Sequence, residues 1–172
     1  FSDLDYNSTS HTTWDTSIAL TRATTMLQAY YSQGNSWYGN ERLKDAIDLV
    51  LQDWADYRYK STNWWYQEID VPKKLVRILF YPLENEPYLP VPRELALLGM
   101  PTVDESLPHL STDIGANLMD KLIVAVAIAA ATRDTVSMKN VVTRLLDHEL
   151  SIFSSVNGGE GIMTDGSFHQ HA

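Results

Sequence analysis

Two histidines stand one residue apart near the end of the printed sequence, directly behind an Asp-Gly turn. The run GEGIMTDGSFHQHA places His169 and His171 after Asp165-Gly166. In an extended segment both imidazoles project to the same side. Such a pair is compatible with a catalytic base or carboxylate partner, with a metal site, or with plain surface histidines. A metal site needs a third ligand, and no other histidine shows ligand spacing, so we expect no metal.

Two adjacent tryptophans form a second chemical feature, in the run STNWWYQEIDVP. Neighbouring side chains diverge by about 100° on a helix and about 180° on a strand, so Trp64 and Trp65 cannot both face one core. We expect at least one indole to be partly exposed, where its face can stack on a sugar ring beside the polar Asn63. The alternative is that these aromatic side chains only wedge two helices together.

A third feature is an asparagine where a long helix is expected to begin, in the run STDIGANLMDK. There Asn117 would lie near free backbone N–H groups at the positive end of the helix dipole, an environment that suits a bound carboxylate. Asparagine is a poor residue for a helix interior, so capping of the helix is the alternative explanation.

Composition limits the classes of partner. The chain has 172 residues, 44% of them hydrophobic, and no cysteine, so it can bury a core but forms no disulfide or thiolate metal site. A net charge of -9 argues against a nucleic-acid or membrane partner. The apolar run 122–131 is too short to span a bilayer, and we interpret it as a buried helix. Lys73, Lys74 and Arg77 form the only basic cluster, which could face an anionic ligand or solvent.

The sequence begins with Phe1 rather than methionine. We therefore expect that a signal peptide or a larger N-terminal region has been removed, and that the protein is secreted or periplasmic.

Helical periodicity dominates the elements that must position these residues. We predict long helices over about 13–33, from Asn40 as N-cap, from Pro72 to Pro82, over about 115–132 and over about 134–153, with one short helix at RELALLG. The first helix is expected to bury Trp14, Ile18, Leu20, Met26, Leu27 and Tyr31. The fold class is therefore all-α, with antiparallel helical hairpins packed as in a bundle or an α/α toroid.

Together, and in this order, NWWYQEIDVP, GANLMDK and GEGIMTDGSFHQH resemble the N-terminal α/α-toroid domain of polysaccharide lyase family 8, which includes hyaluronate, chondroitin AC and xanthan lyases. The resemblance extends from about Trp14 to His171 and includes the run GNERLKDAIDLVLQDW. It implies that residues 1–172 form a single helical domain, part of an incomplete (α/α) toroid, with the C-terminal β-sheet domains of the lyase absent.

The resemblance also assigns residues. It implies that Trp64 and Trp65 form the aromatic patch that stacks on the substrate, with Asn63 as the polar residue beside it. Asn117 matches the catalytic asparagine, and His171, not His169, matches the catalytic histidine. The implied partners are an acidic polysaccharide, such as a glycosaminoglycan or a xanthan-like polymer, and the remainder of the lyase chain.

The chain departs from the family pattern at its end. The family's catalytic tyrosine follows the histidine by less than a dozen residues and arginines come later, but this sequence has no tyrosine beyond Tyr88. We therefore expect that the sequence is interrupted within the active-site motif, and that this polypeptide alone is inactive.

The implied reaction is β-elimination at a uronic acid, which leaves a C4-C5 double bond and requires no cofactor. Either the missing tyrosine or His171 could be the base. Two alternatives from other classes are a non-catalytic carbohydrate-binding helical module and an α/α-toroid glycoside hydrolase. The hydrolase would need two carboxylates beside the bond, for which the sequence offers Glu68, Asp70, Glu160 and Asp165.

Overall fold

A computed structural model describes residues 1–84, 89–106, 115–153 and 161–169. The chain divides into two compact units, Phe1–Met100 and Pro101–Ala172. In the described part of the chain every element of more than two residues is helical, as predicted. The prediction of one helical domain over residues 1–172 stays a prediction.

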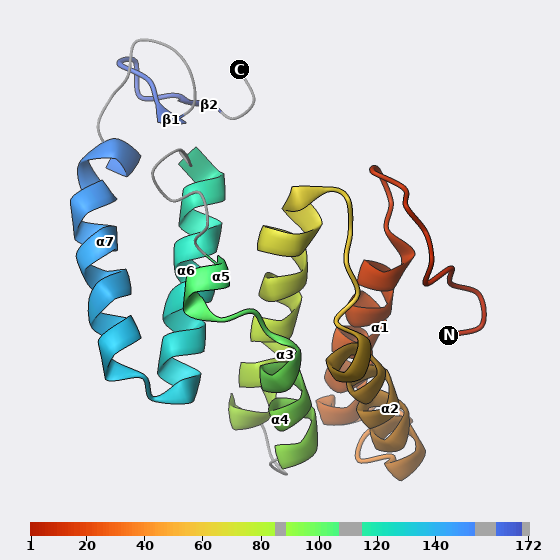
Figure 1. Ribbon diagram of the computed structural model, residues 1–172. Coiled ribbons are helices and arrows are strands. Elements are labelled where there is room, and N and C mark those ends of the chain that lie inside the picture. Colours follow the sequence, from red (N-terminus) through yellow and green to blue (C-terminus); the bar gives the residue numbers. More distant parts are fainter. Residues whose placement is uncertain (85–88, 107–114, 154–160, 170–172) are drawn as a thin grey trace. The chain divides into compact units, whose positions relative to one another are not determined.

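The first unit contains two pairs of helices and a π-helical turn (Figure 1). Its elements are α1 (Asp15–Tyr31), α2 (Glu41–Tyr57), η1 (Tyr66–Asp70), α3 (Val71–Glu84) and α4 (Pro90–Gly99). α1 packs on α2 and α3, and α4 packs on α2 and α3. The predicted ends of the first helix were within two residues of the observed ones, because its boundary signals are local.

Asn40 is the N-cap of α2, as predicted. Its side-chain oxygen accepts a hydrogen bond of 3.1 Å from the backbone N–H of Leu43, which satisfies one of the free donors of the first turn. α2 ends at Tyr57, and the residue that caps it, Arg58, adopts a left-handed conformation with φ of 42°.

The core of the first unit is built around aromatic rings. Trp14 contacts Trp54 edge to face, with 6.0 Å between ring centroids, and Tyr66, with 5.7 Å. The aliphatic side chains packed around them are Leu20, Leu27, Ile47, Leu51, Ile69, Leu75, Ile78 and Leu79, all fully buried. The prediction that Ile18 is buried was wrong, since its side chain is 36% exposed.

The predicted end of the third helix was also wrong. Pro82 does not end α3 but lies inside it, and two further residues follow before the helix ends at Glu84. The short helix predicted at RELALLG is present and ends at Gly99, but it begins three residues earlier, at Pro90. A further helix that was not predicted, α5 (Val103–Ser106), follows. Pro90 suits the first turn of α4, where its missing N–H has no helical partner.

Gly99 lets α4 approach α2 closely. A Cβ atom at this position would lie 2.5 Å from Cδ1 of Trp54, far inside van der Waals contact. The Nε1–H of Trp54 also donates a hydrogen bond of 3.4 Å to the carbonyl oxygen of Gly99. A glycine at the end of α4 is therefore needed for the position of Trp54.

The second unit is a helical hairpin of α6 (Gly115–Thr132) and α7 (Thr135–Phe153), preceded by α5. Both bounds of α6 are as predicted, and Asp134 is the cap of α7, accepting from the N–H groups of Val136 and Ser137 at 3.0 Å. Leu118, Leu122 and Ala125 of α6 pack on Val141 of α7. By length and composition alone α6 could cross a membrane, a property that core helices of soluble proteins share.

A short hairpin follows α7. β1 (Gly161–Ile162) pairs with β2 (Phe168–His169) in antiparallel fashion, with Ile162 opposite Phe168. The predicted Asp-Gly turn connects them: Gly166 has φ of 84°, a conformation that favours glycine.

Candidate functional site

Both tryptophans of the adjacent pair are accessible. Trp64 and Trp65 are helical residues directly ahead of η1, and their side chains are 47% and 39% exposed. The prediction that at least one indole is partly exposed is confirmed. We call this pair the aromatic platform.

The π-helical turn sets the direction in which the aromatic platform faces. The backbone N–H of Val71 donates to the carbonyl oxygen of Tyr66, five residues earlier, instead of four. A π turn carries one extra residue, which rotates the preceding side chains by about 100° relative to α3. Such turns occur frequently at functional sites. Sequence periodicity did not reveal this one.

The platform is anchored to the core through Tyr66. The Tyr66 ring lies between Trp14 and Trp65, with 5.7 and 5.4 Å between ring centroids. Its hydroxyl donates to the carbonyl oxygen of Thr12 at 2.9 Å. Trp14 is itself buried against Trp54. Contacts with the core, through Tyr66, therefore fix the position of Trp65.

Asn63 lies beside the platform, but its amide has structural partners. Its Oδ1 accepts from the N–H of Trp65 at 3.0 Å, and its Nδ2 donates to the carbonyl oxygen of His11 at 2.8 Å. Asn63 therefore caps the helical segment that starts at Trp64 and ties it to the chain before α1. Its role in substrate binding stays a prediction.

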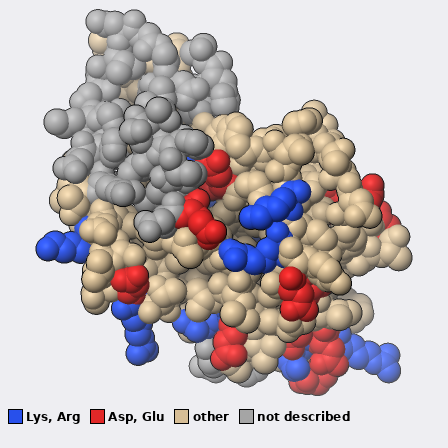
Figure 2. Space-filling model, viewed as in Figure 1, with Lys and Arg blue, Asp and Glu red and all other residues tan. Residues whose placement is uncertain are grey.

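Only part of the predicted basic cluster is available to an anionic ligand. The ammonium group of Lys74 lies 2.7 Å from Oδ2 of Asp70 and also bonds to Ser17 of α1, whereas Arg77 is exposed. Figure 2 shows Lys and Arg side chains interspersed with Asp and Glu on the visible described surface, without a continuous basic patch. Sequence analysis missed this network: the spacing of Asp70 and Lys74 was a signal, but nothing pointed to Ser17.

Asn117 lies in the first turn of α6 and is half-buried. Because α6 begins at Gly115, Asn117 is inside the helix and not at the capping position that precedes it. Its place in the first turn is the predicted one, and its role, whether in binding a carboxylate or in capping, stays a prediction. Asn117 belongs to the second unit, whereas the aromatic platform belongs to the first.

Of the two histidines near the end of the sequence, only His169 is among the described residues, and it is exposed in β2. His171 lies outside the described residues, so its role stays a prediction. Within the described ranges no group of three or more His, Asp or Glu residues could hold a metal ion.

Two of the four carboxylates named for a hydrolase, Asp70 and Asp165, have partners within the structure. Asp70 pairs with Lys74. Asp165 accepts from the hydroxyl and the N–H of Ser167 at 2.7 and 2.9 Å, bonds that lower the pKa of its carboxyl. Glu68 is half-buried in η1, and Glu160 lies outside the described residues. The hydrolase alternative therefore stays a prediction.

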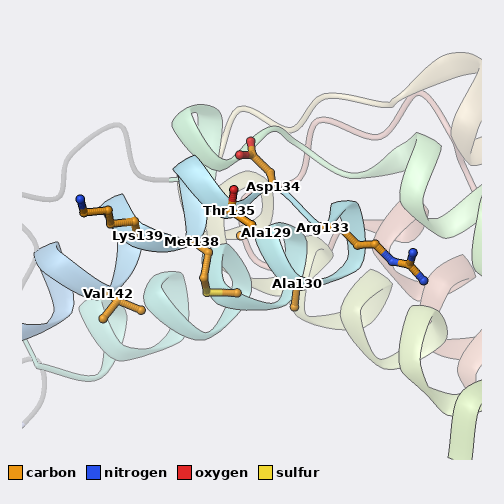
Figure 3. A pocket seen from close by; sticks show the side chains of 8 residues that line it. All are labelled: Ala129, Ala130, Arg133, Asp134, Thr135, Met138, Lys139 and Val142. Carbon is orange, nitrogen blue, oxygen red and sulfur yellow. The ribbon is translucent and has the colours of Figure 1, made fainter.

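A cavity of about 400 Å³ lies at the turn between α6 and α7 (Figure 3). Its polar side chains do not converge: Arg133, Asp134 and Lys139 point in different directions around the apolar Met138. Asp134 is also occupied in capping α7. A ligand site needs convergent polar groups, so we do not assign one here.

Comparison with known proteins places the chain among lyases. The family model described as polysaccharide lyase family 8, N terminal alpha-helical domain, matches residues 1–172. Chondroitinase-AC of Pedobacter heparinus is 27% identical over 98% of this chain and 23% of that protein. Xanthan lyase of a Bacillus species is 29% identical over 87% of this chain and 16% of that protein. The chain thus spans less than a quarter of the length of these relatives.

Solved structures confirm the predicted fold class. A chondroitinase AC lyase, studied in enzyme–oligosaccharide complexes, matches with a TM-score of 0.75 and 24% identity, over 99% of this chain and 24% of that one. A Paenibacillus xanthan lyase matches with a TM-score of 0.69 and 18% identity, over 99% of this chain and 17% of that one. The chain therefore has the antiparallel helical hairpins of this toroid fold.

Proposed function

Since the chain belongs to polysaccharide lyase family 8, we propose that it supplies the helical part of a lyase that cleaves a uronic-acid-containing polysaccharide by β-elimination. The structural observation that carries substrate binding is the exposed aromatic platform of Trp64 and Trp65. Two exposed indoles, of which Trp65 contacts the core through Tyr66, suit the C–H faces of sugar rings.

In this reaction a base removes the proton at C5 of the uronate, the electron pair forms the C4-C5 double bond, and the bond from C4 to the leaving oxygen breaks. The C5 proton is weakly acidic, because the neighbouring carboxylate already carries negative charge. Hydrogen bonds from Asn117 and His171 to that carboxylate would stabilise the developing enolate, by roughly 3 to 4 kcal/mol per donor. They accelerate the reaction only if they strengthen as charge develops.

The base is either the family's tyrosine, which follows the catalytic histidine, or His171 itself. The same group could then return the proton to the leaving oxygen. This assignment rests on the family pattern, and we expect the 172-residue chain alone to release no unsaturated product, because a site that has lost one cooperating member loses most of its rate.

We propose an acidic polysaccharide as the substrate class, in keeping with relatives named for chondroitin, xanthan and hyaluronate. Because such polymers are met outside the cytoplasm, the proposal includes secretion or a periplasmic location. A non-catalytic carbohydrate-binding module would use the same platform but would produce no double bond.

Ultraviolet absorbance of the conjugated product tests the proposal in a protein that carries the family's β-sheet domains behind this chain. Asn117→Ala should lower kcat by about 100-fold or more with little change in KM, because its bond matters most in the transition state. Asn140→Ala, an exposed asparagine of α7, is the matched control and should change neither constant. Normal turnover in Asn117→Ala removes this residue from the mechanism, and a parent protein without unsaturated product refutes the lyase proposal.

A further inference from the structure

A cavity of about 280 Å³ opens beside the aromatic platform, between α1 and η1. Trp65 and Tyr66 form an aromatic wall, and Ile18 of α1 contributes from the other element. Ligand pockets usually measure about 300 to 1,000 Å³. At about 280 Å³ this cavity lies just below that range, which limits it to a single sugar ring and excludes a longer segment of polysaccharide.

The polar end of the cavity consists of Ser17, Asp70 and Lys74. The Asp70 and Lys74 side chains are only 15% and 21% exposed and form an ion pair. The ammonium group of Lys74 donates to Oδ2 of Asp70 and to the hydroxyl and carbonyl oxygens of Ser17. An ammonium group has three donors, so these contacts use all of them.

One acceptor remains in this network. The Ser17 hydroxyl donates to Oδ2 of Asp70, the same oxygen that accepts from Lys74. Within the described part of the chain no hydrogen bond reaches the second oxygen, Oδ1. A carboxylate oxygen can only accept, and the ion pair has no net charge. The cavity therefore suits a hydroxyl donor and disfavours a second carboxylate.

We propose that this cavity, lined by Ser17, Ile18, Trp65 and Asp70, is a subsite for one uncharged sugar ring of the polysaccharide. The ring stacks on Trp65 and donates a hydroxyl hydrogen bond to Asp70. The subsite rests on the proposed function, to which it adds a selection: the neutral ring next to the uronate enters the cavity, and the uronate itself does not.

The 172-residue chain labelled with ¹⁵N allows a direct test, in which a chondroitin hexasaccharide is titrated and the indole N–H signal of Trp65 is followed. Ile18→Trp should fill the cavity without altering the platform and weaken binding by about tenfold, the sum of a lost hydrogen bond and lost stacking. Gln28→Trp, at an exposed position of the same helix, is the matched control and should bind normally.

Single sugars test the selection. We expect N-acetylgalactosamine to shift the Trp65 signal and glucuronate not to shift it, and Asp70→Asn to reverse this order, because Lys74 then lacks its counter-charge. Loss of packing alone would not reverse a preference, and this variant decides the question if Ile18→Trp fails to fold. Normal hexasaccharide binding by folded Ile18→Trp, or equal shifts with both sugars, overturns the subsite.

Trp64→Ala separates this outcome from failure of the proposed function. If Trp64→Ala weakens binding and Ile18→Trp does not, the platform stands and the subsite is wrong. If neither variant weakens binding, both are wrong.

Discussion

Replacing Trp64 with alanine tests the aromatic platform against a control that the chain itself provides. Trp37 lies between α1 and α2 and is 50% exposed, compared with 47% for Trp64. The two side chains therefore lose similar buried area on truncation, but only Trp64 belongs to the platform. A comparison of Trp64→Ala with Trp37→Ala cancels the general cost of deleting a half-buried indole.

The magnitudes follow from these exposures. A fully buried tryptophan removes at most about 250 Å² from water, so either truncation exposes or deletes about 125 Å² of contact. At about 25 cal/mol per Å², this lowers the free energy of unfolding by up to about 3 kcal/mol in each variant. Only Trp64→Ala should also weaken oligosaccharide binding, by about 1 kcal/mol or more, which is roughly fivefold in Kd.

Thermal unfolding followed by circular dichroism measures the first quantity, and calorimetric titration with a chondroitin hexasaccharide measures the second. Equal losses of binding in Trp64→Ala and Trp37→Ala would show that binding follows stability and not stacking. Loss of the helical signal in Trp64→Ala alone would place its indole in the core, and the stacking role would be withdrawn.

Three further changes probe what holds the platform in place. Gly99→Ala should lower the free energy of unfolding by about 1 to 3 kcal/mol, because its Cβ would overlap Trp54. The control is Leu98→Ala, at the exposed neighbouring position. Equal melting temperatures of the two variants would contradict the close approach of Gly99 to Trp54. Deleting Gln67 should convert the π turn to α-helix and abolish saccharide binding while helicity is kept, and unchanged binding would show that the turn does not aim the platform. Burial, with the Asp53 carboxylate, raises the pKa of Tyr59 to about 12. Since an unfolded tyrosine ionises near pH 10, the free energy of unfolding should fall from about pH 10 to about 12. Tyr59→Phe should remove part of this decline, measured by alkaline denaturation. An identical decline in the variant would refute the contribution of Tyr59.

Sequence patterns predicted the features that depend on neighbouring residues. The bounds of α6, the cap at Asn40 and the exposure of the Trp64-Trp65 pair follow from helical periodicity, capping chemistry and side-chain direction. Each of these signals lies within one turn or one helix, and each was confirmed.

Features that depend on contacts between distant residues could not be predicted in this way. The π turn is held by two hydrogen bonds to residues more than 50 positions earlier: Asp70 accepts from Ser17, and Tyr66 donates to Thr12. Its extra residue therefore leaves no periodic signal. Ile18 fits the apolar stripe of α1, yet it faces a cavity that forms only when η1 packs alongside. Gly99 was recognisable as a helix end, but its approach to Trp54 needed the fold.

Charge limits how this part of the protein could bind the acidic polymer that we propose as substrate. The chain carries a net charge of -9, so long-range attraction of a polyanion is absent. Lys74, which lines the cavity beside the platform, is neutralised by Asp70 and has no donor left for a substrate carboxylate. If the platform binds saccharide as proposed, its affinity comes from ring stacking and hydroxyl hydrogen bonds, which do not require opposite charge. Under the proposed function the uronate carboxylate is bound by other residues, for which we propose Asn117, an uncharged side chain in the first turn of α6.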